Sequence, residues 1–439
     1  MLKRKIYKTL LDWKGSPAKK CLIVKGARQV GKTYVIRAFG MNEYKNYIEI
    51  NFLRQPELKA IFEGSLDASE IYKKISAYMP DAHILRRETL LFLDEIQRCP
   101  NARTALKFLT EDGRIDVISS GSLLGLSYGQ DADPEVTEVP SIPVGYETTV
   151  MLYSLDFEEY LWAYGYGEDM IAYLRTFFDR KEKCPVQINQ KFQELLREYL
   201  VIGGMPEVVD HFIKNKDFNE AHDIQVRLLA DYEDDIAQHA KSVEKVKVRR
   251  CYDSIPNQLA RENKKFKYSE VEKKSTAKKY GDSIQWLVDA DMAFLCRNLT
   301  DPALPLRYNE KENEFKVYIN DTGLLMALFG KETKLALLNN TLKGFAKGGI
   351  FENFVAETLV KKGYSLHYYK PDDDSELEFV IEQSGGVVPL EVKAGNTATR
   401  SLNKFMETFR PQIAYKIIDG NVGFTDGKLS VPHYMVMFL

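Results

Sequence analysis

One segment, residues 21–40, constrains this chain most, because it contains a strand, a glycine-rich loop and a helix in that order. The apolar run 21–25 predicts a short buried strand. The pattern G-x-x-x-x-G-K-[ST] follows at once at residues 26–33, and residues 34–39 predict a helix that ends at Gly40. A strand, this loop and a helix in succession are the context that a phosphate-binding P-loop requires.

The loop residues have chemical reasons to be where they are. Gly26 and Gly31 let the backbone approach a phosphate so closely that successive N–H groups face its oxygens. The Lys32 ammonium would reach the β- and γ-phosphates, and the Thr33 hydroxyl would ligate Mg²⁺. The sequence therefore predicts binding of a nucleoside triphosphate, with ATP favoured, together with Mg²⁺. The loop residues expected to contact it are Gly26, Ala27, Arg28, Gln29, Val30, Gly31, Lys32 and Thr33.

A second apolar run, Thr89–Asp94, has the composition of a central parallel strand, which is buried on both faces. Asp94 and Glu95 then lie at its carboxyl end, where ligands bind in open α/β sheets. We expect Asp94 to hold Mg²⁺, directly or through water. Glu95 would activate the attacking water as a general base, and Lys32 would act on the phosphates. These residues predict ATP hydrolysis in addition to binding.

A third strand is predicted at residues 115–120, and it leads into Gly121-Ser122. A small polar residue at this strand end would sense the γ-phosphate or the attacking water, and Ser122 is favoured over Ser120. A simple turn is an equal alternative. The sequence does not identify the arginine that would stabilise phosphoryl transfer. The candidates are Arg28, Arg98, Arg103 and Arg114.

Composition is that of a soluble protein with several domains. Hydrophobic residues make up 44% of the positions and charged residues 28%, which is ordinary for globular chains. A chain of 439 residues is too long for a single hydrophobic core. The five cysteines are scattered singly, which favours reduced thiols over disulfides or a zinc site. No apolar run reaches the roughly 18 residues of a membrane span, and no secretory signal is recognisable. We therefore expect a cytoplasmic protein without membrane contact.

These motifs resemble those of the prokaryotic AAA-type ATPases that carry a C-terminal domain of unknown function related to PD-(D/E)XK nucleases. The resemblance covers nearly the whole chain in the expected order. The matching stretches are GARQVGKT (26–33), LFLDEIQR (91–98), Gly121-Ser122, SLDFEEYL (154–161), YLVIGGMPEVV (199–209), FENFVAETL (351–359) and LEVK (390–393).

The resemblance implies an α/β fold in four parts. These are a P-loop AAA-type ATPase core at 1–165, a helical lid at 166–240, a winged-helix module at 241–335 and a small C-terminal α/β PD-(D/E)XK nuclease-like domain at 345–439. Family members carry a Gly-Arg pair before the SLDF segment, a source of an arginine acting on a neighbouring subunit. Gly145-Tyr146 stands at about that place here, so a homo-oligomeric ring, a dimer and a monomer all stay open.

The segment 241–286 carries 13 Lys/Arg against 6 Asp/Glu, a local charge of +7 in a chain of net charge −2. Lys278 and Lys279 fall at the start of the third predicted helix, where a recognition helix meets nucleic acid. Lysines suit phosphate contact better than base reading. Nucleic acid, with DNA favoured, and a protein partner are therefore both open as ligands of the winged helix. The helices expected before a β-hairpin are 248–261, 268–274 and 275–289.

Strands 376–382 and 387–394 are predicted to form a hairpin around Gly385-Gly386. Glu391 and Lys393 are two residues apart on the second strand, so their side chains share one face. Glu378 would meet them from the first strand. The spacing thus predicts a cluster of carboxylates and a lysine on one face of the hairpin.

This cluster, completed by Glu352, has the composition of the PD-(D/E)XK site, in which carboxylates hold Mg²⁺ and a lysine lies near an attacking water. Glu352 is preferred to Glu357 because it lies at the rim of the apolar helix face, while Glu357 points further toward solvent. The resemblance expects Asp where this chain has Glu378, and the longer side chain moves the carboxylate by about one methylene. An active nuclease and an inactive nuclease-like fold are both open.

We therefore predict an Mg²⁺-dependent, ATP-binding and ATP-hydrolysing AAA-type protein that acts on nucleic acid through its winged helix and nuclease-like domain. The alternative is a nucleotide-controlled switch that binds protein partners and whose nuclease fold is inactive. Nucleic acid should stimulate ATP hydrolysis in a salt-dependent manner only under the first hypothesis.

Overall fold

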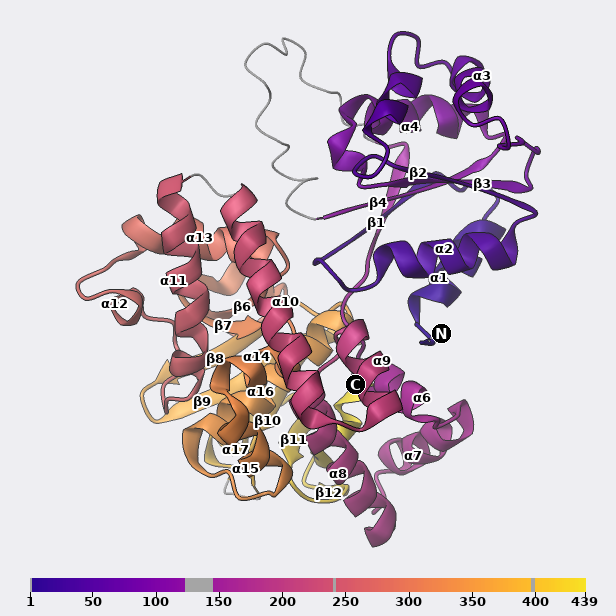
Figure 1. The fold of residues 1–439 in the computed structure, drawn as a ribbon. Helices are drawn as coiled ribbons and strands as arrows, with labels where there is room; N and C mark the ends of the chain where they lie inside the picture. Colours follow the sequence, from indigo (N-terminus) through magenta and orange to yellow (C-terminus); the bar gives the residue numbers. More distant parts are fainter. Residues whose placement is uncertain (1, 123–144, 240–241, 396–398) are drawn as a thin grey trace. The chain divides into compact units, whose positions relative to one another are not determined.

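Five parallel strands in the order β2-β3-β4-β1-β5 form the sheet of the N-terminal unit, residues 3–153 (Figure 1). The structure is a computed structural model and describes residues 2–122, 145–239, 242–395 and 399–439. Every neighbouring pair in this sheet is parallel, so the carboxyl ends of all five strands lie at one edge. The strands are β1 (Cys21–Gly26), β2 (Asn46–Asn51), β3 (Thr89–Asp94), β4 (Asp116–Ser122) and β5 (Glu147–Met151).

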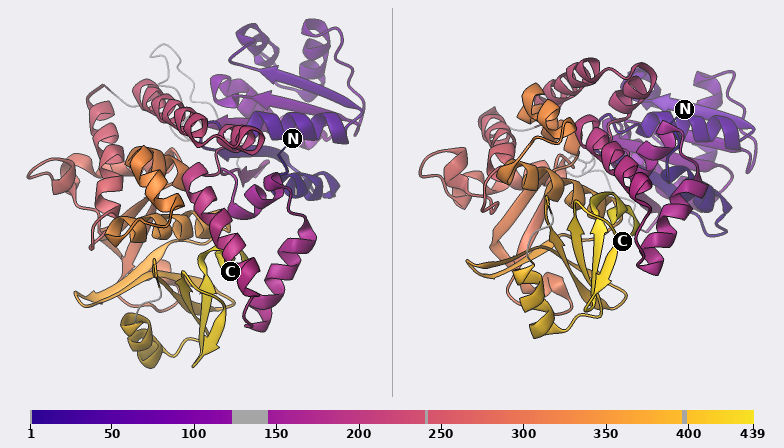
Figure 2. Two further views of the ribbon diagram at one scale, coloured as in Figure 1. Left: turned by 60° about the horizontal axis from the view of Figure 1, so that its bottom comes forward. Right: turned by 90° about the horizontal axis from the view of Figure 1, so that it is seen from below.

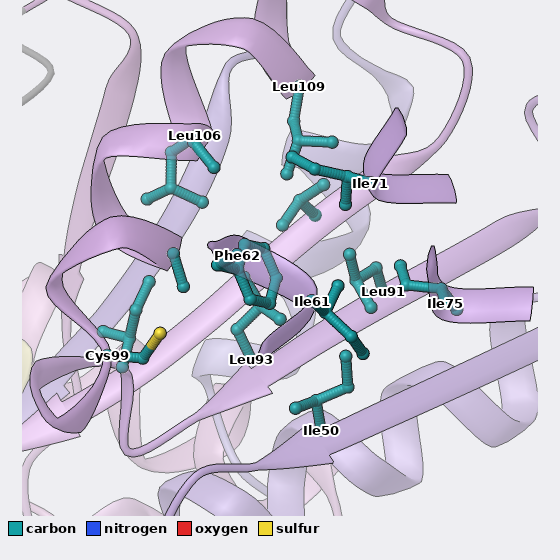
Figure 3. Packing of buried hydrophobic residues seen from close by; sticks show 14 of the residues in the cluster. Ile50, Ile61, Phe62, Ile71, Ile75, Leu91, Leu93, Cys99, Leu106 and Leu109 are labelled. Atoms are coloured by element: carbon teal, nitrogen blue, oxygen red, sulfur yellow. The ribbon is translucent and has the colours of Figure 1, made fainter. Parts of the chain in front are cut away.

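Helices cover both faces of this sheet, with α1 and α2 on one face and α3 and α4 on the other (Figure 1). Figure 3 shows the second of these interfaces, where Ile50 and Leu91 of the sheet meet Ile71 of α3 and Leu106 of α4. Burial on both faces explains why β3 is apolar from Leu90 to Leu93. The helices are α1 (Ile6–Gly15), α2 (Lys32–Glu43), η1 (Pro56–Phe62), α3 (Ala68–Tyr78), η2 (Ile96–Arg98) and α4 (Pro100–Asp112).

The prediction that Gly40 ends the P-loop helix is wrong, because α2 continues to Glu43. Gly40 is fully surrounded: a Cβ atom there would lie 2.3 Å from Cδ2 of the Tyr47 ring. The glycine therefore serves the close packing of α2 on β2, and the helix ends one turn later.

The C-terminal unit, residues 154–439, contains an eight-stranded mixed sheet in the order β12-β13-β11-β10-β9-β8-β6-β7. Its orange and yellow strands, β8 to β13, are seen from two directions in Figure 2. The strands are β6 (Ala293–Leu299), β7 (Glu310–Ile319), β8 (His367–Asp372), β9 (Ser375–Gln383), β10 (Gly386–Val392), β11 (Ala414–Ile418), β12 (Gly423–Thr425) and β13 (Lys428–Pro432).

Helices make up most of the chain between Ser154 and β6, and further helices lie between and after the strands of the sheet. The ones before β6 are α6 (Phe157–Tyr164), α7 (Glu168–Arg180), α8 (Val186–Ile202), α9 (Pro206–Asn215), α10 (Phe218–His239), α11 (Ser242–Leu259), α12 (Tyr268–Val271) and α13 (Ala277–Asp289). The later ones are η3 (Leu306–Asn309), α14 (Thr322–Phe329), α15 (Lys331–Leu338), α16 (Gly344–Lys361), α17 (Arg400–Phe409) and η4 (His433–Phe438).

The segment expected to be a winged helix has the predicted element order, with α11, α12 and α13 followed by the antiparallel hairpin β6–β7. This hairpin does not stand alone, because β6 also pairs in parallel with β8 of the following segment. The two segments therefore share one sheet. The boundary between compact units falls at Tyr153–Ser154, and the finer division into lid, winged helix and nuclease-like domain stays a prediction.

Helix α16 is buried on all sides rather than on one face. Every residue from Gly349 to Leu359 is buried, including Glu352 and Glu357. The prediction that Glu357 points toward solvent is therefore wrong. Its carboxylate accepts a hydrogen bond from the Thr322 backbone N–H at 2.7 Å and one from the Tyr199 hydroxyl at 3.1 Å. The helical wheel failed here because α16 packs against helices and against the sheet at once.

The Gly203-Gly204 break between α8 and α9 is held by contacts within the C-terminal unit. A Cβ at Gly203 would lie 2.7 Å from the Gly323 Cα, and the Gly204 N–H donates to Asp321 at 2.8 Å. The Gly204 carbonyl accepts from the Leu155 N–H at 2.7 Å. These bonds identify the break as a structural turn.

All five cysteines are free and buried. In the part of the chain that the structure describes, no helix combines the length and the apolar character that crossing a membrane requires.

Two adjacent glycines of α16 provide a test of this packing. A Cβ at Gly349 would lie 2.3 Å from the Leu259 carbonyl oxygen, while nothing lies within 4 Å of one at Gly348. Gly349→Ala should lower the free energy of unfolding by about 1–3 kcal/mol through overpacking. Gly348→Ala should raise it by up to about 1 kcal/mol, because alanine loses less backbone entropy in a helix. Chemical denaturation of both variants checks this, and shifts of the same sign would contradict the packing described here.

Candidate functional site

The glycine-rich loop between β1 and α2 has the backbone that its two glycines allow. Gly26 has a φ of 154° and Gly31 a φ of 92°, conformations that other residues rarely adopt. A Cβ on Gly26 would also lie 2.1 Å from the carbonyl oxygen of Leu152. Gly31 is the N-cap of α2, so the loop leads directly into the positive end of a helix dipole.

The Lys32 ammonium lies inside the loop, where it donates to the carbonyl oxygens of Gly26 at 3.0 Å and Ala27 at 2.7 Å. The loop is also held from outside by Arg4, a buried side chain that the sequence argument missed. Its guanidinium donates to the carbonyl of Val30 at 3.0 Å and to that of Tyr153 at 2.6 Å. No local motif marks Arg4, because its partners lie far along the chain.

Asp94 stands at the carboxyl end of β3 and gathers polar groups from neighbouring elements. The Thr33 hydroxyl lies 3.2 Å and 3.1 Å from its two carboxylate oxygens. Asn51, at the end of β2, donates to it at 2.7 Å, and the Ser120 hydroxyl of β4 also donates to it. The predicted Mg²⁺ ligands Thr33 and Asp94 are thus brought together by the fold.

Two residues that contact Asp94, Ser120 and Asn51, differ from the sequence-based prediction. Ser120, which the argument ranked second, contacts Asp94, while the side chain of Ser122, the last residue of β4, lies outside the described residues. Asn51 was missed, although a polar residue at the end of a predicted strand was an available signal. Its side-chain oxygen also accepts from the N–H groups of Leu53 and Arg54, so its amide orientation is set.

The chemistry of these donors fits a hard cation. A hydroxyl and a carboxylate are the oxygen ligands that Mg²⁺ prefers. Burial raises the pKa of the Asp94 carboxyl, while the hydrogen bonds from Ser120 and Thr33 act against that rise. A cation at this position would therefore meet a carboxylate whose charge it stabilises.

Glu95 follows Asp94 directly and has a φ of 57°, in the left-handed region that few residues other than glycine adopt. Its carboxylate accepts a hydrogen bond from the Gln97 side chain at 2.6 Å. Backbone strain of this kind is concentrated at functional sites, because the surrounding structure must impose it. The conformation turns the chain sharply directly after the carboxyl end of β3.

The arginine candidates are placed differently. Arg114 precedes β4, so it lies at the sheet edge opposite the P-loop, where it pairs with Asp112 at 2.8 Å. Arg103 pairs with Glu147 at 3.3 Å. Arg98 ends η2 after Glu95, and Arg28 is part of the loop itself. Arg114 therefore lies away from the sheet edge that carries the P-loop. The geometry of a single chain does not decide which of the other three arginines would contact the phosphates.

The C-terminal carboxylate cluster also forms largely as predicted. Strands β9 and β10 make the expected hairpin, in which Gln383 pairs with Gly386. The Lys393 ammonium lies 3.1 Å from Glu378 and 3.5 Å from Glu391. Glu378 additionally accepts from the Val392 N–H at 3.0 Å. One oxygen of Glu391 is buried and has no hydrogen-bond partner in the described part of the structure.

Glu352, the third expected metal ligand, has different partners. Lys264 lies 2.6 Å from one of its oxygens, and Lys316 lies 3.3 Å from the other. The Tyr318 hydroxyl donates to that second oxygen at 3.2 Å. Over residues 2–122, 145–239, 242–395 and 399–439, no group of three or more His, Cys, Asp and Glu side chains is placed to hold a metal ion. The residues present therefore do not fit the expected three-carboxylate metal site.

Electrostatics follow these pairings. Burial raises the pKa of Glu391 to about 7, in spite of Lys393, and burial also raises the pKa of Glu378. Burial alone would raise the pKa of Glu352 as well, but the ammonium groups of Lys264 and Lys316 outweigh it and lower that pKa. Glu352 is thus held as a carboxylate by lysines that its sequence neighbourhood did not reveal.

Comparison with known proteins agrees with the N-terminal assignment. Residues 18–161 match the family model described as an AAA domain. Residues 193–335 and 347–433 match two models, each described as a domain of unknown function (DUF8612 and DUF4143). Uncharacterized proteins of Mycobacterium bovis and Mycobacterium tuberculosis are each 32% identical over 136 residues. The matched segment is 30% of this chain and 28% of each relative, so the alignment spans less than a third of those proteins.

Solved structures were also found to be similar. One is a Walker-type ATPase of Pyrococcus abyssi, with 13% identity, 75% of this chain and 96% of that chain covered, and a TM-score of 0.44. Another is AMPPCP-bound DnaA from Aquifex aeolicus, with 13% identity, coverage of 65% and 86%, and a TM-score of 0.27. Scores below 0.5 do not establish a shared overall fold. The family match and the P-loop geometry, by contrast, support an AAA-type P-loop domain at residues 18–161 and, with it, nucleotide binding.

Proposed function

We propose that the N-terminal unit binds ATP with Mg²⁺ and hydrolyses it. The observation that carries this proposal is the contact between the Thr33 hydroxyl and the Asp94 carboxylate, 3.1 Å apart at the end of a glycine-rich loop. The two groups come from different strand–helix connections, so their meeting is a property of the fold. Thr33 and Asp94 are the residues that would hold Mg²⁺, which supplies positive charge to the phosphates when it is bound.

The remaining residues have separable tasks. The backbone N–H groups of the loop and of the start of α2 would donate hydrogen bonds to the phosphate oxygens. The positive φ angles of Gly26 and Gly31 give the loop the conformation that this requires. Lys32 would exchange its two backbone carbonyl partners for phosphate oxygens. Glu95 would orient the attacking water and accept its proton. Gln97 holds the Glu95 carboxylate before that step.

We further propose that the surface at the start of α13 contacts a polyanion, with DNA as the favoured ligand. Lys273, Lys274 and Lys278 are exposed and carry no ion pair in the described part of the structure. Lys279, in contrast, is paired with Glu272 at 2.7 Å. Nuclease action is not included, because Glu352 is bound by two lysines. A nucleotide-controlled, protein-binding switch is the competing proposal.

Lys32 and Glu95 should separate binding from hydrolysis. Lys32→Ala should remove detectable ATP binding in calorimetry, because the loop loses the ammonium group that would contact the β- and γ-phosphates. Glu95→Gln should keep ATP affinity and lower the turnover rate by about 10²–10⁴-fold, the range of general-base catalysis.

Two substitutions at the opposite edge of the sheet serve as controls for these variants. Lys20 precedes β1, and Glu88, next to β3, pairs with Lys45. Lys20→Ala and Glu88→Gln should leave binding and turnover unchanged. Undiminished ATP affinity in the Lys32→Ala protein would refute the proposed phosphate site.

Asn51 gives a test of the Mg²⁺ ligands through a residue that need not touch the ion. Asn51→Ala should raise the half-saturating Mg²⁺ concentration for ATP hydrolysis by about tenfold or more, because Asp94 loses a donor that orients it. Asn46→Ala is the matched control, since Asn46 starts the same strand and donates to Thr89 at the other edge. An equal effect of both variants would indicate general destabilisation of β2 instead.

The nucleic-acid proposal is tested by ATP turnover with and without DNA at several salt concentrations. DNA should stimulate turnover less as salt rises, since counterion release drives such contacts. Lys274→Ala combined with Lys278→Ala should weaken the stimulation, while Lys279→Ala, whose ammonium is already paired, should weaken it less. Turnover that is indifferent to DNA would favour the protein-binding switch.

A further inference from the structure

A group of eight oppositely charged side chains lies together in the C-terminal unit. Its carboxylates come from α16, β9 and β10. Its ammonium groups come from the connection between α11 and α12, from β7, from β8 and from the residue that follows β10. Within the described residues, every member has at least one ion-pair partner in the group, and the formal charges cancel. The members are Glu352, Glu376, Glu378, Glu391, Lys264, Lys316, Lys370 and Lys393.

Two of the lysines come from outside the segment 347–433 that carries the carboxylates. Lys264 lies in the connection between α11 and α12, and Lys316 lies on β7. The Lys316 side chain is only 1% exposed, and that of Lys264 only 10%. Both therefore reach the carboxylates through the interior of the C-terminal unit.

Lysine ammonium groups pair with Glu352 and Glu376, each of which has two lysine partners. Lys264 and Lys316 divide the two oxygens of Glu352 between them, and Lys316 also lies 2.6 Å from Glu376. Glu376 is bound a second time by Lys370 at 3.3 Å. Glu352 and Glu376 thus have their negative charge matched at close range.

A divalent cation would have to share this space with the ammonium groups. Lys316 has no alternative position in water, because it is part of a paired strand and its side chain is buried. A metal ion bound by Glu352 would place two more positive charges beside the buried Lys316 ammonium and leave Glu376 as its close counter-charge, which is unfavourable in a region of low dielectric. The same problem does not arise at Asp94, whose partners are neutral hydroxyl and amide groups.

We infer that the charged group in the C-terminal unit is an ionic core whose charges balance without a divalent cation, and in which Lys264 and Lys316 supply the positive charge beside Glu352 and Glu376. This core joins the segment that carries α11–β7 to the segment that carries α16–β10. The same two segments also share one sheet, in which β6 pairs with β8. The C-terminal unit is then a structural or binding module and not a metal-dependent nuclease.

The experiment measures Mn²⁺ retention by electron paramagnetic resonance, with the full chain carrying Asp94→Ala and no nucleotide, so that the P-loop holds no ion. This protein should retain no more Mn²⁺ than the same protein carrying Glu391→Gln in addition. One retained Mn²⁺ that Glu391→Gln or Glu378→Gln removes would overturn the inference. This comparison does not depend on the ATPase proposal.

A second pair of variants tests the role of the lysines directly. Lys316→Met and Lys264→Met together remove both ammonium groups and keep most of the side-chain volume. If this protein folds, as circular dichroism would show, it should gain a Mn²⁺ site that Glu352→Gln abolishes. Folding without any gain of Mn²⁺ would count against the lysines as the excluding groups. If it does not fold, the Glu391→Gln comparison still decides the matter.

DNA cleavage provides an independent readout in the same preparations. The Asp94→Ala protein should leave single- and double-stranded DNA intact with Mg²⁺ or Mn²⁺. Metal-dependent cleavage that Lys393→Ala removes, and that Lys20→Ala leaves unchanged, would overturn the inference.

Discussion

The hydrogen bonds to the Asp94 carboxylate hold together the ligand-binding edge of the N-terminal sheet. Asn51, Thr33 and Ser120 reach it from β2, α2 and β4, so three separate connections end at one side chain. A buried carboxylate is costly unless its oxygens are paired, and this cost makes the position of each donor definite. The glycine-rich loop is in turn fixed by Arg4, which donates to Val30 and Tyr153. The nucleotide chemistry proposed for this unit depends on that preorganised edge.

In the C-terminal unit the corresponding constraint is the burial of α16 with its polar side chains. Asn353 donates to the Ile319 carbonyl at 3.0 Å and accepts from the Ile319 N–H at 2.8 Å, so it satisfies both backbone groups at the end of β7. Glu357 accepts from the backbone at the start of α14. A helix that binds its neighbours in this way cannot be separated from them. The matched segments 193–335 and 347–433 are therefore parts of one structural unit.

The two clusters of acids differ in the charge of their partners, and that difference decides what each can bind. The partners of Asp94 are neutral, and one of them, the Thr33 hydroxyl, is itself a suitable ligand for Mg²⁺. The partners of Glu352 are ammonium groups, which repel a metal ion and which burial prevents from moving away. Acidic residues thus suit the proposed cation site in one unit and the proposed ion-paired core in the other.

Much of the N-terminal site could be predicted, because the P-loop from Gly26 to Thr33 is contiguous and its strand and helix flank it directly. The placement of Asp94 and Glu95 followed as well, since a strand buried on both faces is apolar up to its end. Predictions that needed the three-dimensional surroundings were less successful. Gly40 does not end α2, and Glu357 is buried, because packing against distant segments overrides a local pattern.

The sequence by itself determined the phosphate-binding loop, its strand and the C-terminal hairpin, because short stretches of chain contain all the residues that each of these needs. Only the tertiary structure decided which charged side chains meet. Lys264 and Lys316 precede Glu352 by many residues, and no local spacing relates them to it. Long-range contact and burial set both the partner and the charge of a buried acid, so the character of the C-terminal cluster emerges only once the chain has folded.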